Sequence, residues 1–297
     1  MTARSAANDR TERTDDTTER SRQHGAEPMT AGSEADDRRS AEPVTALFSG
    51  VGVALVTVFD EAGDVDPGST GKLAADLAGR GVRAVLVCGS TGEAATLSDT
   101  ERTVLIEAVR AAVPAGVPVI AGTGAPSSRQ ATALTRAAVL AGADAVLTWC
   151  PAGGPDLAGY FAAVHEAADG RPVLAYHNPW MSSAEIPVDA LASLPVTGLK
   201  DSSGSPDRLL DELAHYPGEV YVGSSGYLAL AGPMGADGAL LALANVEPEV
   251  CARAFGGDAG AQRELADRHL EVRRGGPAAI KRILATTHGI SPAARVR

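Results

Sequence analysis

The stretch PVIAGTGAPSSRQATALTRAAVLAGADAVLTWC, residues 118–150, contains one complete strand-helix-strand unit. Two aliphatic runs, at 118–123 and 145–150, flank an amphipathic segment at 128–141. Glycine, proline, serine and aspartate stand at the junctions, where a chain turns between a strand and a helix. Both runs are almost continuously apolar, which indicates strands buried on both faces in a parallel sheet.

The same unit recurs from Val44 onward. Alternation of strands and helices that closes at eight units predicts an α/β fold, a (β/α)8 TIM barrel with additional C-terminal helices. An open, doubly wound sheet is the alternative, but residues 59–63 read Phe-Asp-Glu-Ala-Gly, which is not a glycine-rich dinucleotide turn. The strand candidates are residues 51–59, 84–89, 118–123, 145–150, 172–177, 196–201, 220–224 and 238–244.

The helix candidates and the domain limits follow from the same pattern. Residues 1–43 contain no Val, Ile, Leu, Phe, Tyr or Trp, so a segment at 1–45 cannot offset its ordering entropy and is predicted to be a disordered tail. The barrel is expected within residues 46–246, and helices at 247–297 are expected to complete and extend it. The helix candidates are residues 99–113, 128–141, 157–168, 206–215, 227–234, 247–255, 258–272 and 277–287.

Composition excludes several classes of protein. The length of 297 residues suits one barrel, and 44% hydrophobic residues provide a core. A formal net charge of −11 argues against a nucleic-acid partner. No apolar run is long enough for a membrane span or a secretory signal, so we expect a cytoplasmic protein without a membrane partner. Cys88, Cys150 and Cys251 lie far apart, which predicts buried thiols and no metal site.

In a barrel of this kind the active site lies at the C-terminal ends of the strands. Three predicted strands carry polar residues at their C-terminal ends. The second ends in Gly89-Ser90-Thr91-Gly92-Glu93, the fifth in Tyr176-His177-Asn178-Pro179, and the sixth in Lys200-Asp201-Ser202.

Lysine occurs only as Lys72, Lys200 and Lys281, and arginine supplies the remaining positive charge. Lys72 and Lys281 fall in helix patterns and are interpreted as solvated side chains. Lys200 ends an apolar strand, where loss of water favours the neutral amine. A neutral amine can attack a ketone and form an imine, which arginine cannot do. The alternative is a structural Lys200 that caps a helix or pairs with Asp201.

Two further motifs accompany Lys200. Ser90 and Thr91, between two glycines, offer hydroxyl and backbone N–H groups that can hold a carboxylate, although an ordinary capped turn would look the same. Tyr176 can pass protons to and from a carbinolamine, or it can simply be a buried ring. The coincidence of these groups at the ends of three strands favours the catalytic interpretation.

Together the motifs Gly89–Glu93, Tyr-x-x-Pro at 176–179 and Gly-Leu-Lys-Asp at 198–201 identify a resemblance over roughly residues 46–290. The chain resembles the dihydrodipicolinate synthase and N-acetylneuraminate lyase superfamily of class I pyruvate-dependent aldolases. The resemblance implies that Lys200 forms an imine with pyruvate or another 2-oxo acid, without a further cofactor. It also implies a homo-oligomer and, as second partner, an aldehyde.

Site residues follow from this resemblance. Lys200, Tyr176 and Ser90 are the predicted catalytic residues, with Tyr176 as the proton shuttle hydrogen-bonded toward Ser90. The predicted substrate-binding residues are Thr91, Gly89, Gly92, Asn178, Trp180 and Ser224.

The chain departs from the family pattern in two places. Dihydrodipicolinate synthases carry an arginine shortly after Tyr-x-x-Pro, but this chain reads Trp180-Met181-Ser182, which argues against an authentic dihydrodipicolinate synthase. Trp180 and Met181 instead suggest an apolar distal pocket and an aromatic or aliphatic aldehyde. A relay tyrosine expected after the fourth strand is replaced by Pro151-Ala152-Gly153-Gly154. His177, adjacent to Tyr176 in a strand, is expected to face the helices.

The sequence therefore predicts a Schiff-base lyase or aldolase that makes or breaks a carbon-carbon bond. A dehydratase or deaminase of a hydroxylated 2-oxo acid would use the same imine chemistry. A barrel that binds a ligand without turnover is the third possibility.

Overall fold

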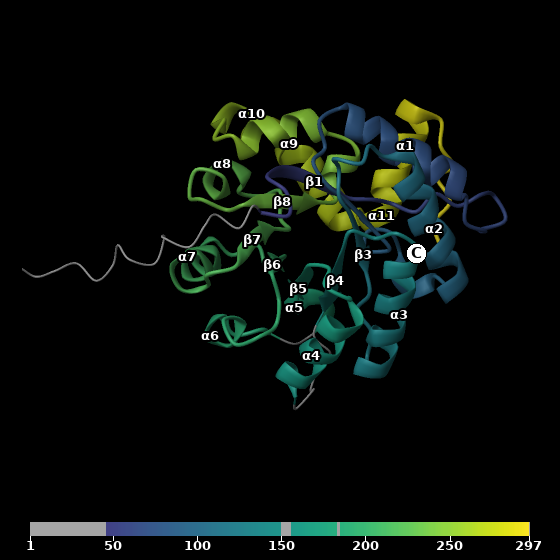
Figure 1. Cartoon of the computed structure of the whole chain (residues 1–297). Coiled ribbons are helices and arrows are strands. Elements are labelled where there is room, and N and C mark those ends of the chain that lie inside the picture. Colours follow the sequence, from purple (N-terminus) through teal and green to yellow (C-terminus); the bar gives the residue numbers. More distant parts are fainter. Residues whose placement is uncertain (1–45, 150–155, 183–184, 297) are drawn as a thin grey trace, which may run out of the picture. The chain divides into compact units, whose positions relative to one another are not determined.

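The computed structural model describes residues 46–149, 156–182 and 185–296, which form a closed barrel of eight parallel strands with helices around it (Figure 1). The strands follow in chain order around the barrel, and β8 closes it by pairing with β1 from Gly50↔Gly238 to Val53↔Leu241. The predicted TIM barrel is confirmed. The predicted tail at 1–45 and the run Pro151–Gly154 lie outside the described residues.

The strands fall where the aliphatic runs predicted them, with one marked difference at the first. After Ala54 the chain leaves the ladder, because Asn245 Oδ1 accepts the N–H of Val56 and Thr70 Oγ1 accepts the N–H of Val58. The first strand is therefore shorter than the predicted 51–59. The strands are β1 Gly50–Ala54, β2 Val85–Val87, β3 Val119–Gly122, β4 Ala145–Trp149, β5 Val173–His177, β6 Gly198–Asp201, β7 Glu219–Val222 and β8 Gly238–Leu241.

Helices cover the outside of the barrel. Those of the main units are α1 Pro67–Gly79, α2 Asp99–Ala112, α3 Ser128–Leu140, α4 Leu157–Ala167, α5 Pro179–Ser182, α6 Val188–Leu191, α7 Pro206–His215 and α8 Leu228–Ala231, with 3-10 turns η1 Ala94–Thr96 and η2 Leu243–Asn245. The C-terminal helices are α9 Pro248–Phe255, α10 Ala259–Glu264 and α11 Ala266–His288. No helix in the described ranges is long and apolar enough to cross a bilayer.

The last two predicted helices, at 258–272 and 277–287, differ from the helices in the structure. The predicted helix at 258–272 is two helices, α10 and the start of α11, which meet at Leu265. Residues 277–287 continue α11 after a kink at Gly276, which has a φ of 53°. Pro277, which lacks an N–H donor, follows that kink.

Side-chain caps fix the starts of several helices after strands. Ser98 and Glu101 form a capping box at α2, with each side chain bonded to the other's backbone N–H. Ser127 accepts from the N–H of Gln130 at α3, and Ser205 does the same at α7. These serines end the loops at the mouth of the barrel and set where each helix begins.

Two apolar regions hold the fold together. One lies between the sheet and the helices, and the other fills the barrel interior. At the N-terminal end of the interior, Phe48 stacks on Tyr221 with ring centroids 4.5 Å apart. At the opposite end the interior layer finishes with Leu147 and Tyr176. The interior of the barrel is thus a packed core, and a substrate would bind at its C-terminal mouth.

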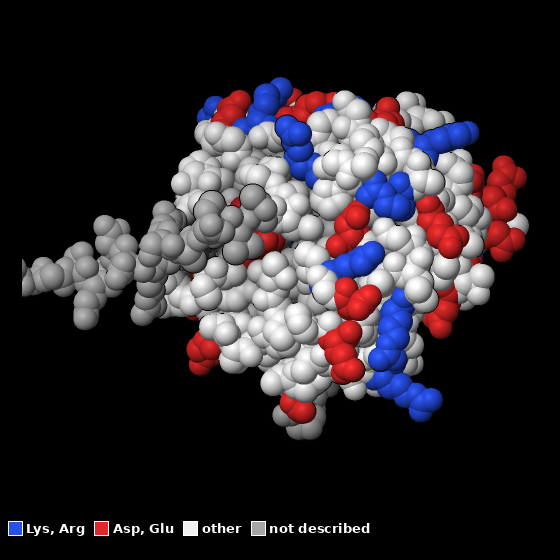
Figure 2. Space-filling model, viewed as in Figure 1, with Lys and Arg blue, Asp and Glu red and all other residues white. Residues whose placement is uncertain are grey.

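Charged side chains of both signs are interspersed on the face shown in Figure 2, over the part where α1, α2 and α3 lie. That face carries no extended basic patch of the kind that binds a phosphate backbone.

Candidate active site

Lys200 and Tyr176 lie side by side on neighbouring strands. They are register partners in the β5–β6 ladder, and residues opposite one another in adjacent strands point to the same face. Lys200 is 4% exposed and Tyr176 is 6% exposed. The Lys200 Nζ lies 4.5 Å from the centroid of the Tyr176 ring. The predicted amine and phenol are therefore brought together in one buried place.

Polar groups surround the Tyr176 hydroxyl. It lies 3.4 Å from Ser90 Oγ, and Asn178 Nδ2 donates to it over 2.8 Å. Burial raises the pKa of this phenol, but the Lys200 ammonium and hydrogen bonds with Ser90, Ser202 and Asn178 outweigh burial, so the net pKa is lowered. A phenol with a lowered pKa exchanges its proton more readily, as a proton shuttle must.

The Gly89–Glu93 turn presents Ser90 and Thr91 to the mouth. Its backbone is closed by the Gly92 N–H donating to Gly89 O over 3.0 Å, and Thr57 Oγ1 donates to Gly92 O over 2.7 Å. A Cβ on Gly92 would meet Leu55 O at 3.0 Å, so glycine allows the close approach. Gly92 shapes the turn and lines neither of the cavities at the mouth.

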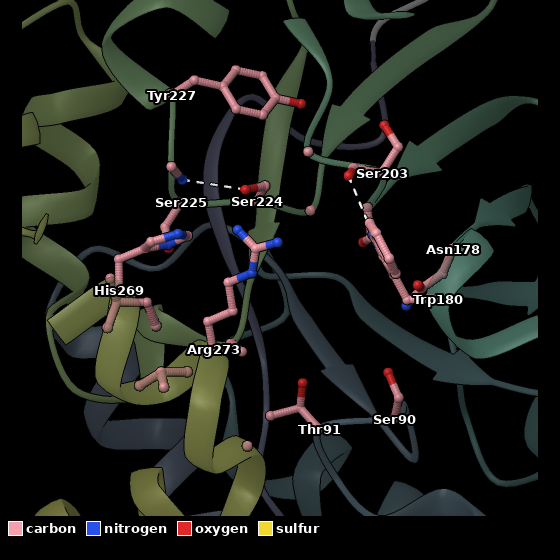
Figure 3. Close-up of a pocket in the computed structure, with 18 of the residues that line it drawn as sticks. Ser90, Thr91, Asn178, Trp180, Ser203, Ser224, Ser225, Tyr227, His269 and Arg273 are labelled. Atoms are coloured by element: carbon pink, nitrogen blue, oxygen red, sulfur yellow. Dashed lines mark hydrogen bonds between the residues drawn. The ribbon is translucent and has the colours of Figure 1, made fainter. Parts of the chain in front are cut away.

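A cavity of about 770 Å³ opens beside this turn (Figure 3). The predicted residues Ser90, Thr91, Asn178, Trp180 and Ser224 all line it. Sequence reasoning missed several others that line it as well: Ser203, Ser225, Tyr227, His269 and Arg273. Ser202 also lines it, two residues beyond Lys200.

A second cavity, of about 580 Å³, lies toward β3 and β4. Gly89, Tyr176, Trp149 and Met181 line it, and Ser90 lines both cavities. Met181 and Trp180 thus line different cavities, and Trp180 is 78% exposed. The apolar distal pocket that Trp180 and Met181 together suggested is therefore not built by both side chains.

Charged groups lie behind the site, on the helix side of β5 and β6. His177 is 2% exposed, and its Nδ1 accepts the N–H of Ile186 over 3.2 Å. Burial and the nearby Arg208 lower the His177 pKa to about 4. Asp201 accepts from the Ser203 N–H and hydroxyl and lies 3.5 Å from Arg208 Nε. His177 faces the helices as expected, and Asp201 is engaged on that side, away from Lys200.

The interpretation of Lys281 as a solvated side chain is wrong. The helix pattern suggested a solvated side chain, but Lys281 is fully buried and its Nζ lies 2.5 Å from Glu93 Oε1. Helix α11 passes beneath the Gly89–Glu93 turn instead of lying on the surface along its whole length.

Cys88 and Cys251 are buried thiols. Burial raises the pKa of the Cys88 thiol to about 12 and also raises that of Cys251, as expected for inert buried cysteines. Across the described part of the chain, no group of three or more His, Cys, Asp and Glu side chains is arranged to hold a metal ion.

A (β/α)8 barrel that holds a buried lysine against a tyrosine at its C-terminal mouth offers the amine and the phenol that a class I lyase, an enzyme that works through a Schiff base, requires. The chain belongs to the dihydrodipicolinate synthetase family, whose model matches residues 47–272. It is accordingly a Schiff-base lyase or aldolase that acts on a 2-oxo acid.

Relatives and solved structures agree with this assignment. A 4-hydroxy-tetrahydrodipicolinate synthase of Salinibacter ruber is 35% identical over 240 residues, which are 76% of this chain and 78% of that protein. A dihydrodipicolinate synthase from Acinetobacter baumannii, complexed with pyruvate, superposes with a TM-score of 0.77 at 29% identity, covering 84% of this chain and 91% of its own. YagE, a prophage protein of the same family from E. coli K12, also in complex with pyruvate, has a TM-score of 0.77 at 25% identity and covers 84% and 92%.

Proposed function

We propose that this protein is an aldolase in which Lys200 forms an imine with pyruvate and the resulting enamine adds to, or is released from, an aldehyde. The observation that carries the proposal is the buried pair itself, with Lys200 Nζ 4.5 Å from the centre of the Tyr176 ring and Ser90 Oγ 3.4 Å from the Tyr176 hydroxyl. Pyruvate is supported by two related structures that hold it.

The proposed sequence starts with release of a proton from the Lys200 ammonium to solvent, followed by attack of the neutral amine on the C2 carbonyl carbon. The carbonyl oxygen takes up a proton and the attacking nitrogen loses one, which gives a neutral carbinolamine. A second proton on the oxygen lets it leave as water, and a protonated imine remains. The Tyr176 phenol supplies and recovers these protons, because its hydroxyl is bonded to Ser90 and Asn178 and its pKa is lowered.

The protonated imine then acts as an electron sink. Loss of a proton from C3 gives a neutral enamine, whose C3 attacks the carbonyl carbon of an aldehyde and forms the new carbon-carbon bond as the aldehyde oxygen is protonated. Water hydrolyses the product imine and regenerates Lys200. In the reverse direction the same steps cleave the bond. Because the imine itself accepts the electron pair, the proposed chemistry requires no further cofactor.

The Ser90–Thr91 turn would hold the carboxylate of the 2-oxo acid. Both side chains line the large cavity, and the turn lies beside the Tyr176 hydroxyl. Hydroxyl and backbone N–H donors in a tight turn suit a carboxylate, which accepts several hydrogen bonds at once. This arrangement would place the C2 carbon of pyruvate between the turn and the lysine.

Trapping with borohydride tests the proposal. Incubation with pyruvate and sodium borohydride, followed by peptide mass spectrometry, is expected to show one reduced adduct, on the peptide that contains Lys200. The exposed Lys72 serves as an internal control for nonspecific modification. The Lys200→Arg variant, which keeps the charge but cannot form the imine, is expected to show no adduct. An unmodified Lys200 in the wild-type protein would overturn the proposal.

A further inference from the structure

A basic side chain enters the large cavity from the C-terminal helix. Arg273, on α11, lines this cavity together with His269, one helical turn earlier. Figure 3 shows the Arg273 side chain rising from α11 into the cavity toward the loop that carries Ser224 and Ser225, with Trp180 on the opposite side. Neither α11 residue belongs to a strand end, where chemistry in a barrel is usually sought.

The charge balance of the cavity is one-sided. Among the residues that the structure describes, its lining contains no aspartate, glutamate or lysine, and Arg273 is its one arginine. His269 does not add to the charge, because burial, and then the adjacent Arg273, lower its pKa, and its Nδ1 lies 2.8 Å from Ser225 Oγ. Of the described side chains that line this cavity, Arg273 therefore supplies the positive charge.

Arg273 is also unpaired within the protein. Arg80, Arg110 and Arg253 each form an ion pair with a carboxylate, whereas Arg273 makes no ion pair with any carboxylate in the described parts of the chain. In a protein with a formal net charge of −11, acidic side chains are abundant elsewhere. A guanidinium that points into a cavity without a counter-ion is available to an anionic ligand.

The surroundings of Arg273 suit the end of a small molecule. Ser203 and Ser224 bring hydroxyl groups to the same cavity, and the Tyr227 hydroxyl and Asn178 Oδ1 are buried and have no hydrogen-bond partner in the structure. The planar guanidinium can donate two parallel hydrogen bonds to one carboxylate. Ser90 and Thr91, the proposed site for the carboxylate of the 2-oxo acid, line the same cavity but lie apart from the Arg273 guanidinium (Figure 3), so a carboxylate at Arg273 would belong to the second substrate.

We infer that Arg273 binds a carboxylate at the far end of the second substrate, so that the enzyme selects acidic aldehydes over neutral aliphatic or aromatic ones. The inference rests on the proposed aldolase function and adds a substrate class to it. It also replaces the expectation of an aliphatic or aromatic aldehyde that the sequence Trp180-Met181 suggested, since the cavity that contains Trp180 is the one that contains Arg273.

The test compares two aldehydes of equal length, succinic semialdehyde and butanal, each with pyruvate. Replacing Arg273 by Met should lower kcat/KM for succinic semialdehyde by about 10- to 100-fold, mainly through KM, because one charge-assisted pair is lost. Turnover of butanal should not change. The Arg273→Lys variant should retain part of the activity with the acidic aldehyde, since it keeps the charge but not the fork of donors.

Arg274→Met is the matched control. Arg274 is the next residue on α11 and, like Arg273, is exposed, but it does not line the large cavity, so its loss removes the same charge from the same helix. The Arg274→Met variant should keep the wild-type kcat/KM for both aldehydes. The inference would be overturned if Arg273→Met lowered kcat/KM equally for the two aldehydes. It would also be overturned if Arg273→Met and Arg274→Met changed kcat/KM for succinic semialdehyde to the same extent.

Two further measurements separate this inference from the proposed function. Borohydride trapping of pyruvate on Lys200 should be as complete in Arg273→Met as in the wild type, and its loss would mean that Arg273 serves the pyruvate end or the fold. Calorimetric titration of succinate needs no turnover. Wild type should bind succinate at least about 10-fold more tightly than Arg273→Met, and equal affinities would overturn the inference even if Lys200 forms no imine.

Discussion

Lys281 Nζ lies 2.5 Å from Glu93 Oε1, and neither side chain has any exposed surface. The two residues are 188 positions apart, one on α11 and the other closing the turn after β2. The other carboxylate oxygen of Glu93 accepts the backbone N–H groups of Arg295 and Val296 over 2.7 Å each. Glu93 itself has a φ of 57°, a conformation that costs a non-glycine residue about 1–2 kcal/mol. This pair therefore holds the C-terminal segment against the turn that carries Ser90.

Removal of the lysine should destabilise the protein strongly. Replacing Lys281 by Met leaves the Glu93 carboxylate buried without its cation, and the free energy of unfolding should fall by about 3–5 kcal/mol. Urea titration followed by circular dichroism measures it. Lys72→Met, which removes an exposed lysine, should change stability by less than about 0.5 kcal/mol. Similar stabilities for the two variants would show that the buried pair is not a main support of the fold.

The same pair should matter for binding of the 2-oxo acid. The double variant Glu93→Gln, Lys281→Met removes both charges, so it should recover part of the stability lost by Lys281→Met. Its KM for pyruvate should stay raised, because the hydrogen bonds that fix the Ser90–Thr91 turn are weakened. Recovery of stability together with a wild-type KM would contradict a positioning role for Glu93.

Removal of the Tyr176 hydroxyl should separate imine formation from fold stability. In Tyr176→Phe we expect kcat to fall by about 10²- to 10⁴-fold, the usual contribution of general acid–base catalysis. Lys200 should still be trapped by borohydride with pyruvate on long incubation, because its amine is intact. The control is Tyr221→Phe, whose phenol donates to Glu219 toward the closed end of the barrel. It should lower the melting temperature but not kcat, and a Tyr176→Phe enzyme with wild-type kcat would exclude Tyr176 as the proton shuttle.

The fold could be predicted because its signals are local. Each buried parallel strand is an aliphatic run such as residues 145–149, and each following helix begins at a capping residue such as Ser127 or Ser205. Chain order then gives the barrel, since its neighbours are consecutive strands. The strand-end rule placed Lys200 and Tyr176 correctly, and the two are register partners.

The wall formed by α11 could not be predicted, because it depends on where a C-terminal helix packs after the barrel has closed. Nothing near Arg273 or Lys281 in the sequence distinguishes a cavity arginine or a buried lysine from a solvated one. The kink at Gly276 lies between them and alters the direction of the helix axis. Ser202 could have been proposed from its place two residues beyond Lys200. The roles of Arg273 and Lys281 required the tertiary contacts.

Burial of His177 should make the protein sensitive to acid. Its pKa is about 4 in the folded protein, below the reference value of 6.5, so the unfolded chain takes up the proton first. The stability that it contributes is complete above about pH 6.5 and is lost as the pH falls toward 4, by roughly 3 kcal/mol in total. In His177→Gln, urea titrations between pH 7 and pH 4.5 should show a shallower loss of stability. A wild-type slope in His177→Gln would show that His177 does not set the acid limit.

Burial of Glu212 should make the protein less stable as the pH rises, whereas burial of His177 makes it less stable as the pH falls. Burial, and then the charge of Asp201, raise its pKa to about 8 from a reference of 4.5, although Arg208 Nε lies 2.7 Å from its carboxylate. The folded protein thus holds a proton that the unfolded chain releases, so the contribution of Glu212 is complete below about pH 4.5 and is lost as the pH rises toward 8, by about 1.4 kcal/mol per pH unit at most. Glu212→Gln keeps a neutral side chain at every pH. It should match the wild type in urea titrations at pH 5 and exceed it at pH 8.5, whereas a variant less stable than the wild type at pH 8.5 would show that the charged Glu212–Arg208 pair stabilises the fold.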